Sequence, residues 1–307
     1  MRLPTKSDFP STKRELAEDV IAGITVAVVA LPLAIGFGIT SGMSAAAGIS
    51  TAIIAGFIAA LFGGSRLQVS GPTGAMTVIL IPVIDKFGVI AVPALGLIAG
   101  LFVIVMALLK MGTLINKVPH YVIEGFTLGI AIIIALQQLP MALGVKKGEG
   151  ERTLVIAFNT IAKGWESGFN YSAIAIVIVT LAFKFNFARI LKTLRISAYI
   201  PASFAALIFG SLTAALLGLK LQTIGEIPRN VASFKAPIFD NLTSLLWPAL
   251  MIALLAAIES LLSARVADSM AHMPQEKRLE PDQELLGQGF ATAVASIFGG
   301  QPATGAI

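Results

Sequence analysis

The stretch Ser70-Gly71-Pro72-Thr73-Gly74-Ala75-Met76-Thr77 opens a short apolar segment that ends near Asp85. A serine before the segment and a proline in its first turn are typical of a helix start, so we expect a helix over 72–85 with Ser70 as its N-cap. Such a helix covers about 21 Å, less than the roughly 30 Å of a hydrocarbon core. It is therefore predicted to begin inside the bilayer, where its free N–H groups and the positive end of its dipole can bind an anion.

The composition is that of a protein that spans a membrane several times. Hydrophobic residues make up 56% of the 307 residues and charged residues 13%, and the mean hydropathy is +0.87. A soluble domain is about 25% charged, so we predict an all-α polytopic membrane protein. Cysteine is absent, the net charge is only +5, and the P-loop, zinc-protease and nucleophile-elbow motifs are missing. Neither an enzyme nor a nucleic-acid partner is expected.

Apolar segments predict nine membrane segments and the start of a tenth, at 17–41, 45–62, 72–85, 90–109, 118–139, 172–187, 197–217, 243–264, 283–298 and from 303. Lysine and arginine favour the side on which residues 1–15 lie, which places the N-terminus in the cytoplasm and the protein in the cytoplasmic membrane. Between the fifth and sixth segments, Leu154, Phe158, Ile161 and Trp165 share one helical face. This pattern predicts an amphipathic helix at the outer membrane interface.

A second copy of the opening signature ends the sequence. Phe298-Gly299-Gly300 and Pro302-Ala303-Thr304-Gly305-Ala306 repeat Phe62-Gly63-Gly64 and Pro72-Thr73-Gly74-Ala75. The segment 72–85 runs outward and the one starting at 303 runs inward, which is the pattern of an inverted repeat whose two half-helices face each other near the midplane. The alternative is a pair of independent helices kinked by glycine and proline.

Glu259 is the one acid deep inside segment 243–264. An ionised carboxylate at such a depth costs on the order of 3 kcal/mol, so it needs a partner, a cation or a proton. Ser263 lies one turn later on the same face. We predict a cation-coupling site, and the alternative is a structural carboxyl bonded inside the bundle. Phe37 follows Pro32 in the first segment, where the proline kink either lets Phe37 line a cavity or only eases packing.

Taken together, these motifs resemble the SulP (SLC26) anion transporters, and most closely their bacterial sulfate and bicarbonate permease branch. The resemblance covers nearly the whole chain and includes Leu31-Pro32, Ile258-Glu259-Ser260-Leu261-Leu262-Ser263 and Glu284-Leu285-Leu286-Gly287-Gln288-Gly289. It implies a seven-plus-seven inverted repeat in which a core domain moves against a gate domain. By this resemblance, 1–15 is a cytoplasmic N-terminus, 16–140 holds core segments 1–4 and the start of the gate, 141–242 holds gate segments 6–7 with outer loops, and 243–307 holds core segments 8–9 and the start of segment 10.

The resemblance also implies functional residues. Backbone N–H groups would cradle the anion beside Phe37, and these belong to Thr73, Gly74, Ala75, Ala303, Thr304 and Gly305. Glu259 and Ser263 would bind or relay the coupling cation, and a sodium site would add Ala303 and Thr304. Glu259 stands where sodium-coupled members have Asp, which leaves proton coupling equally open. Leu33 stands where many relatives have Gln, and this leaves the substrate open.

The resemblance therefore implies secondary active transport of sulfate or bicarbonate with Na⁺ or H⁺, by alternating access. Apart from that coupling ion no cofactor is expected, and the expected partners are the anion, the lipid bilayer, a second copy in a homodimer and a cytoplasmic STAS domain in a full-length product. A uracil/xanthine-type permease and a non-transporting anion-binding membrane protein are the alternatives. The family has four further segments after the tenth, whereas this sequence halts at Ile307. It is either a fragment or a product that lacks part of its core and gate and does not transport alone.

Overall fold

The computed structural model describes residues 9–117, 120–150, 152–194, 202–221, 231–240, 242–274 and 278–306. The described chain is mostly helical and forms two compact units. Unit 1 comprises Met1–Leu128 and Glu226–Ile307, and unit 2 comprises Gly129–Gly225. Residues 1–8 of the predicted N-terminus, residues 197–201 of the predicted seventh segment and Ile307 lie outside the described residues.

The elements of unit 1 are α1 (Lys13–Thr40), α2 (Ala45–Phe62), β1 (Val69–Gly71), α3 (Gly74–Phe87), η2 (Val89–Ala91), α4 (Val92–Leu108), η3 (Met111–Lys117), α9 (Leu242–Met270), α10 (Pro281–Ile297) and β2 (Thr304–Ala306). Helix α5 (His120–Leu143) begins in unit 1 and continues into unit 2, which also holds α6 (Thr153–Ser167), α7 (Tyr171–Leu194) and α8 (Ala202–Leu216). Among the described residues, five helices are long and apolar enough to cross a membrane: α1, α2, Val89–Leu108, Tyr171–Thr193 within α7, and α9. The predicted all-α membrane fold is confirmed.

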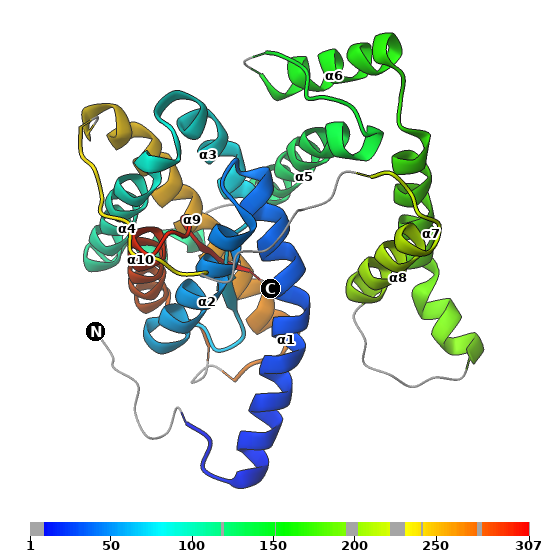
Figure 1. Ribbon diagram of the computed structural model, residues 1–307. Coiled ribbons are helices and arrows are strands. Elements are labelled where there is room, and N and C mark those ends of the chain that lie inside the picture. The colour runs from blue at the N-terminus through cyan, green and yellow to red at the C-terminus, as the bar shows by residue number, and fades with distance from the viewer. Residues whose placement is uncertain are drawn as a thin grey trace. The chain divides into compact units, whose positions relative to one another are not determined.

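In unit 1, α10 packs against both α4 and α2 (Figure 1). Glycines allow this close approach, because a Cβ on Gly100 would stand 2.5 Å from the carbonyl oxygen of Gly289, and one on Gly287 would stand 2.5 Å from Gly63. Residues of α3, α4, α9 and α10 form an apolar core in which Leu95 is fully buried. This packing fixes the positions of the starts of α3 and β2.

Helix α3 has 14 residues, which correspond to about 21 Å of helix. The prediction of a helix too short to cross the bilayer is confirmed. Its start differs from the expectation, because Ser70 lies in β1 and Thr73 is the N-cap. Two features keep Ser70 out of the helix: Val69–Gly71 pairs with Thr304–Ala306, and Gly71, which precedes Pro72, is pushed toward extended conformations.

Strands β1 and β2 form an antiparallel ribbon, with Val69 opposite Ala306, Ser70 opposite Gly305 and Gly71 opposite Thr304. The tenth segment is expected from the sequence to start at 303, and this start position is wrong, since Thr304–Ala306 is a strand; the segment itself lies outside the described residues. A buried backbone must bond its N–H and C=O groups inside the protein. The two copies of the signature satisfy part of this requirement by pairing with each other.

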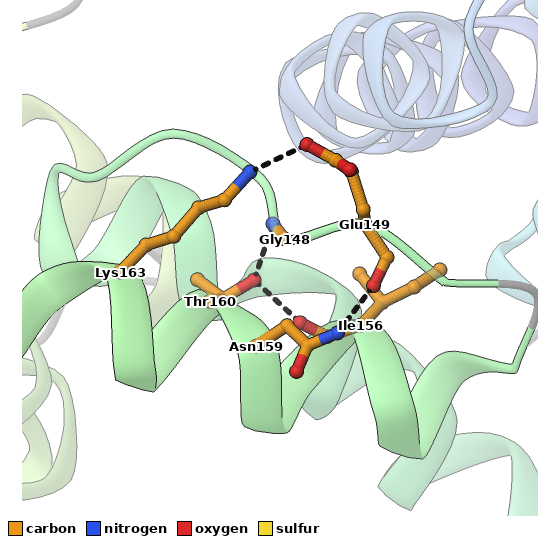
Figure 2. Close-up of polar contacts among 6 residues, drawn as sticks. All are labelled: Gly148, Glu149, Ile156, Asn159, Thr160 and Lys163. Atoms are coloured by element: carbon orange, nitrogen blue, oxygen red, sulfur yellow. Dashed lines mark hydrogen bonds and ion pairs between the residues drawn. The ribbon is translucent and has the colours of Figure 1, made fainter.

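In unit 2, the loop that follows α5 lies along the polar side of α6 (Figure 2). The N–H of Gly148 donates to Oγ1 of Thr160 at 2.9 Å, and Nδ2 of Asn159 donates to the carbonyl oxygen of Glu149 at 2.7 Å. Nζ of Lys163 lies 3.0 Å from Oε1 of Glu149. These contacts fix one face of α6 against its own connecting loop.

The opposite face of α6 is apolar and exposed. Leu154, Phe158 and Trp165 are 70%, 73% and 78% exposed, and Ile161 is 38% exposed. The amphipathic helix expected from the sequence is confirmed, whereas its place at the outer membrane interface stays a prediction.

Candidate functional site

Glu259, Thr73 and Thr304 meet at the start of α3. Oε2 of Glu259 accepts hydrogen bonds from Oγ1 of Thr73 at 3.1 Å and from Oγ1 of Thr304 at 3.0 Å. The two hydroxyl oxygens lie 3.2 Å apart. Thr73 precedes α3, Thr304 begins β2 and Glu259 lies in α9, so one carboxylate joins three segments that are distant in the sequence.

The start of α3 keeps its N–H groups free of a side-chain cap. Thr73 occupies the N-cap position but makes no capping hydrogen bond with its side chain, because its hydroxyl points to Glu259. The positive end of a helix dipole and uncapped N–H groups together favour an anion. Gly74 and Ala75, two of the predicted anion-binding residues, form this first turn and are buried.

A cavity of about 310 Å³ lies against this helix start, within unit 1. One wall belongs to α1 and includes Leu33 and Phe37. The other belongs to the ribbon, with Ser70 and Ala306, and to the N-cap of α3, Thr73. Phe37 therefore lines a cavity, as one of the two sequence interpretations held. Its role beside a bound anion stays a prediction.

The second repeat presents its backbone differently. The N–H of Ala303 donates to Oγ1 of Thr292 at 3.4 Å, and the N–H of Gly305 donates to Oγ of Ser260 at 2.9 Å. Two of the three predicted N–H donors on this side are thus bonded to hydroxyl groups of α9 and α10. The first repeat supplies the uncapped helix start.

Ser263 binds the ribbon rather than the carboxylate of Glu259. Its Oγ donates to the carbonyl oxygens of Glu259 and Gly305, each at 2.9 Å. Of the predicted sodium ligands, only the side chains of Glu259 and Thr304 bond to each other, and the carbonyl oxygen of Ala303 accepts from Thr292. The atoms around the Glu259 carboxylate that could coordinate a cation are all oxygens, which suits a hard cation such as sodium. The carboxylate can also carry a proton.

Sequence reasoning missed Gln68. Its Nε2 donates to the carbonyl oxygen of Ser260 at 2.8 Å and makes a second, short hydrogen bond to Ser263. It therefore ties the loop before β1 to the helix that carries Glu259. Gln68 stands in an irregular segment, so no periodic pattern could have revealed this contact.

The role of Glu284 was also missed. It is 2% exposed, and its Oε2 accepts from the N–H groups of Gly64 and Ser65, each at 2.9 Å. Nε2 of Gln288 donates both to Oε1 of Glu284 at 2.8 Å and to Oγ of Ser70 at 2.6 Å. The spacing of four residues between an acid and an amide in an apolar segment was a usable signal.

Comparison with known proteins supports the same reading of the fold. The chain is 37% identical over 298 residues to the Bacillus subtilis protein named "Putative sulfate transporter YvdB", covering 96% of this chain and 55% of that protein. It is 32% identical over 322 residues to the bicarbonate transporter BicA of Picosynechococcus, covering 100% and 54%. The chain thus spans about half the length of these curated relatives.

A solved structure of the transmembrane domain of a cyanobacterial bicarbonate transporter BicA matches with a TM-score of 0.81 and 32% identity, over 96% of this chain and 76% of that chain. The family described as "Sulfate permease family" matches residues 16–307, which include both copies of the signature and Glu259. With the uncapped half-helix, the ribbon and the bridging carboxylate in place, this chain belongs to the sulfate permease (SulP/SLC26) family.

Proposed function

We propose that this chain forms part of a secondary transporter that moves a small inorganic anion, sulfate or bicarbonate, across the cytoplasmic membrane together with Na⁺ or H⁺. The observation that carries the proposal is the Glu259 carboxylate, which bridges Thr73 and Thr304 beside the uncapped start of α3. The similarity to proteins named as sulfate and bicarbonate transporters supports an inorganic anion as the substrate.

The bridge gives a physical route to coupling. In the absence of a cation, the carboxylate accepts the hydroxyl protons of Thr73 and Thr304 and repels an anion at the helix start. A sodium ion or a proton on Glu259 removes the negative charge and frees a hydroxyl to donate to the anion. The N–H groups of Gly74 and Ala75 complete the anion's donors, and Phe37 covers its other side. Coupling of this kind is reciprocal, so each ion raises the affinity for the other by the same factor.

The wider transport cycle belongs to the proposal as well. Alternating access would move a core domain, containing segments 1–4 of 16–140 and residues 243–307, against a gate that begins with segment 5 and includes 141–242. The N–H groups of Ala303 and Gly305 would join the anion by exchanging their present hydroxyl partners. A homodimer, a cytoplasmic N-terminus and a cytoplasmic STAS domain in the full-length product complete this picture.

The test is uptake of labelled bicarbonate and labelled sulfate by proteoliposomes holding the full-length gene product, with and without sodium and proton gradients. Glu259→Gln keeps the shape of the side chain but removes its charge, and Glu259→Asp is the matched control that keeps the charge. A hydrogen bond to a charged group contributes about 1.5–3 kcal/mol, so we expect Glu259→Gln to lower gradient-driven uptake at least about tenfold.

We expect Glu259→Asp to retain a dependence on the gradient. If a folded Glu259→Gln protein keeps the wild-type cation dependence, the coupling role of Glu259 is wrong. If anion binding occurs without flux through the full-length protein, the chain belongs to a non-transporting anion-binding protein. Uptake of labelled uracil in place of both anions would favour the nucleobase alternative.

A further inference from the structure

We infer that the end of α7 far from Tyr171 carries a binding site for an anionic phospholipid. The site consists of the side chains of Lys184, Arg189 and Lys192, which we term the basic face of α7. The inference concerns unit 2 alone and holds whether or not the chain transports an anion. In the proposed orientation of the chain, this end of α7 lies at the cytoplasmic leaflet.

The three basic side chains lie on one side of α7. At about 100° per residue, Lys192 is about 80° around the helix from Lys184, and Arg189 is about 140° from it. All three residues are exposed, and Phe185, which lies within the same arc, is 78% exposed. The basic face therefore offers three positive charges beside one aromatic ring.

The other side of α7 packs against α8 (Figure 1). The rings of Phe183 and Phe209 stack with their centroids 4.2 Å apart, and a Cβ on Gly210 would stand 2.4 Å from Oγ1 of Thr180. The middle of the basic face is about 170° around the helix from Phe183. The contacts with α8 therefore turn the basic face outward from this helix pair.

Unit 2 offers no acidic partner to these charges. Residues 167–225, which include all of α7 and α8, contain no aspartate and no glutamate. The acids of unit 2 all precede α7 in the sequence, and they are Glu149, Glu151 and Glu166. Within the described part of the chain, the side chains of the basic face form no hydrogen bond and no ion pair. Charge complementarity therefore favours an anion from outside the chain.

The depth of Lys184 identifies that anion as part of a lipid. Tyr171 begins α7 and is 76% exposed, and an aromatic residue in this place is typical of a membrane interface. A hydrocarbon core of about 30 Å corresponds to about 20 helical residues, so α7 reaches the far interface near Leu191. Lys184 lies about 20 Å from Tyr171 along the helix, about 10 Å short of that interface. Its ammonium group reaches the headgroups by extending toward Lys192.

Two general trends explain only part of this pattern. The negative end of the helix dipole favours a cation in the last turn, which accounts for Lys192. The preference of cytoplasmic loops for basic residues accounts for positions near or beyond the interface, but not for Lys184. A lipid phosphate accounts for all three, because it accepts from Arg189 and Lys192, which are neighbours at i and i+3, and from the extended Lys184. The acyl chains of the same lipid cover Phe185.

The test measures lipid contact at the basic face itself. Phe185→Trp is introduced into the full-length gene product, which is reconstituted in bilayers with equal amounts of phosphatidylglycerol, an anionic lipid, and phosphatidylcholine, which has no net charge. One of the two lipids carries bromine, and quenching of the added tryptophan fluorescence is measured against the protein without the substitution. One basic residue near an anionic surface favours it about fivefold. We therefore expect phosphatidylglycerol to quench at least about threefold more strongly than phosphatidylcholine.

Two sets of substitutions locate the effect. In the first, Lys184→Gln, Arg189→Gln and Lys192→Gln are combined, and we expect the ratio of quenching by the two lipids to fall to about one. The matched control replaces by glutamine three exposed lysines of unit 2 outside α7, and they are Lys146, Lys147 and Lys220. The control removes the same charge from unit 2, and we expect it to keep the preference for phosphatidylglycerol.

Each outcome decides for or against the lipid site. Equal quenching by both lipids in the Phe185→Trp protein overturns the inference, and so does a preference that survives loss of the three charges. Quenching by neither lipid shows that protein covers the basic face, which also refutes the inference. If the triple variant does not fold, the Phe185→Trp protein decides, because the preference should weaken between about 0.05 M and about 0.5 M salt. Uptake is not measured, so these results are independent of the proposed function.

Discussion

Replacement of Glu284 by alanine is expected to destabilise unit 1, because this buried carboxylate holds the turn that leads into the site. Its oxygens accept from two backbone N–H groups, of Gly64 and Ser65, and from Nε2 of Gln288. Alanine leaves these three donors without that acceptor. Because Gln288 also donates to Ser70 in β1, the disturbance reaches the ribbon.

The magnitude follows from the number of orphaned donors. A buried donor that loses its acceptor costs about 1–3 kcal/mol. The turn is only half-buried, so each of the three donors is counted at the low end of that range. The free energy of unfolding then falls by about 3 kcal/mol. For a chain of this size 1 kcal/mol corresponds to about 2–4 °C, so the melting temperature should fall by at least about 6 °C.

Glu284→Gln is the matched control. Its amide oxygen can still accept from Gly64 and Ser65, and Oε1 of Gln288, which has no hydrogen-bond partner in the structure, can accept from the new amide after a flip of Gln288. The loss of charge assistance then limits the effect to about 1 kcal/mol.

The assay is thermal unfolding of purified protein in detergent, followed by the loss of the monodisperse peak in size-exclusion chromatography. Both variants and the wild type are heated under one set of conditions. The reasoning is refuted if Glu284→Ala melts within about 2 °C of the wild type. If Glu284→Gln and Glu284→Ala lower the melting temperature equally, then the charge of Glu284, rather than the hydrogen bonds that it accepts, stabilises the turn.

Two further predictions concern packing and the membrane. A Cβ on Gly48 would stand 1.8 Å from a backbone oxygen of α1, so Gly48→Ala should overpack the contact by about 1–3 kcal/mol and lower the melting temperature by several degrees. Gly36 has open space around it, so Gly36→Ala should leave the melting temperature unchanged or raise it. In a Trp247→Phe protein, Trp165 is the remaining tryptophan, and we expect lipids brominated near the headgroup to quench its fluorescence more than lipids brominated at the chain end. Equal quenching by both lipids, or none, would contradict an interfacial α6.

The half-helix was predictable because its signals are local. Pro72 and the length of the apolar run after it limit the helix to the span that α3 occupies. That Glu259 has hydrogen-bond partners was predictable for a similar reason, since an acid in an apolar segment requires a partner whatever the surrounding fold. Both inferences used only the residue and its neighbours in the sequence.

The ribbon was not predictable from the same information. Whether Thr304–Ala306 is helix or strand depends on a partner more than two hundred residues earlier in the chain, and glycine and alanine permit either conformation. Gln68 and Glu284 illustrate the same limit, because their partners are mostly backbone groups that come close only after α9 and α10 have packed.

Within the described residues, the two copies of the signature differ in conformation although their sequences match. Thr73 and Thr304 occupy the same place in each Thr-Gly-Ala, and both donate to one oxygen of Glu259. Thr73 is the N-cap of a helix start without a side-chain cap, whereas Thr304–Ala306 is extended, and the N–H groups of Ala303 and Gly305 donate to Thr292 and Ser260. Because the two threonines share a single acceptor, a change of charge on that acceptor acts on both repeats at once.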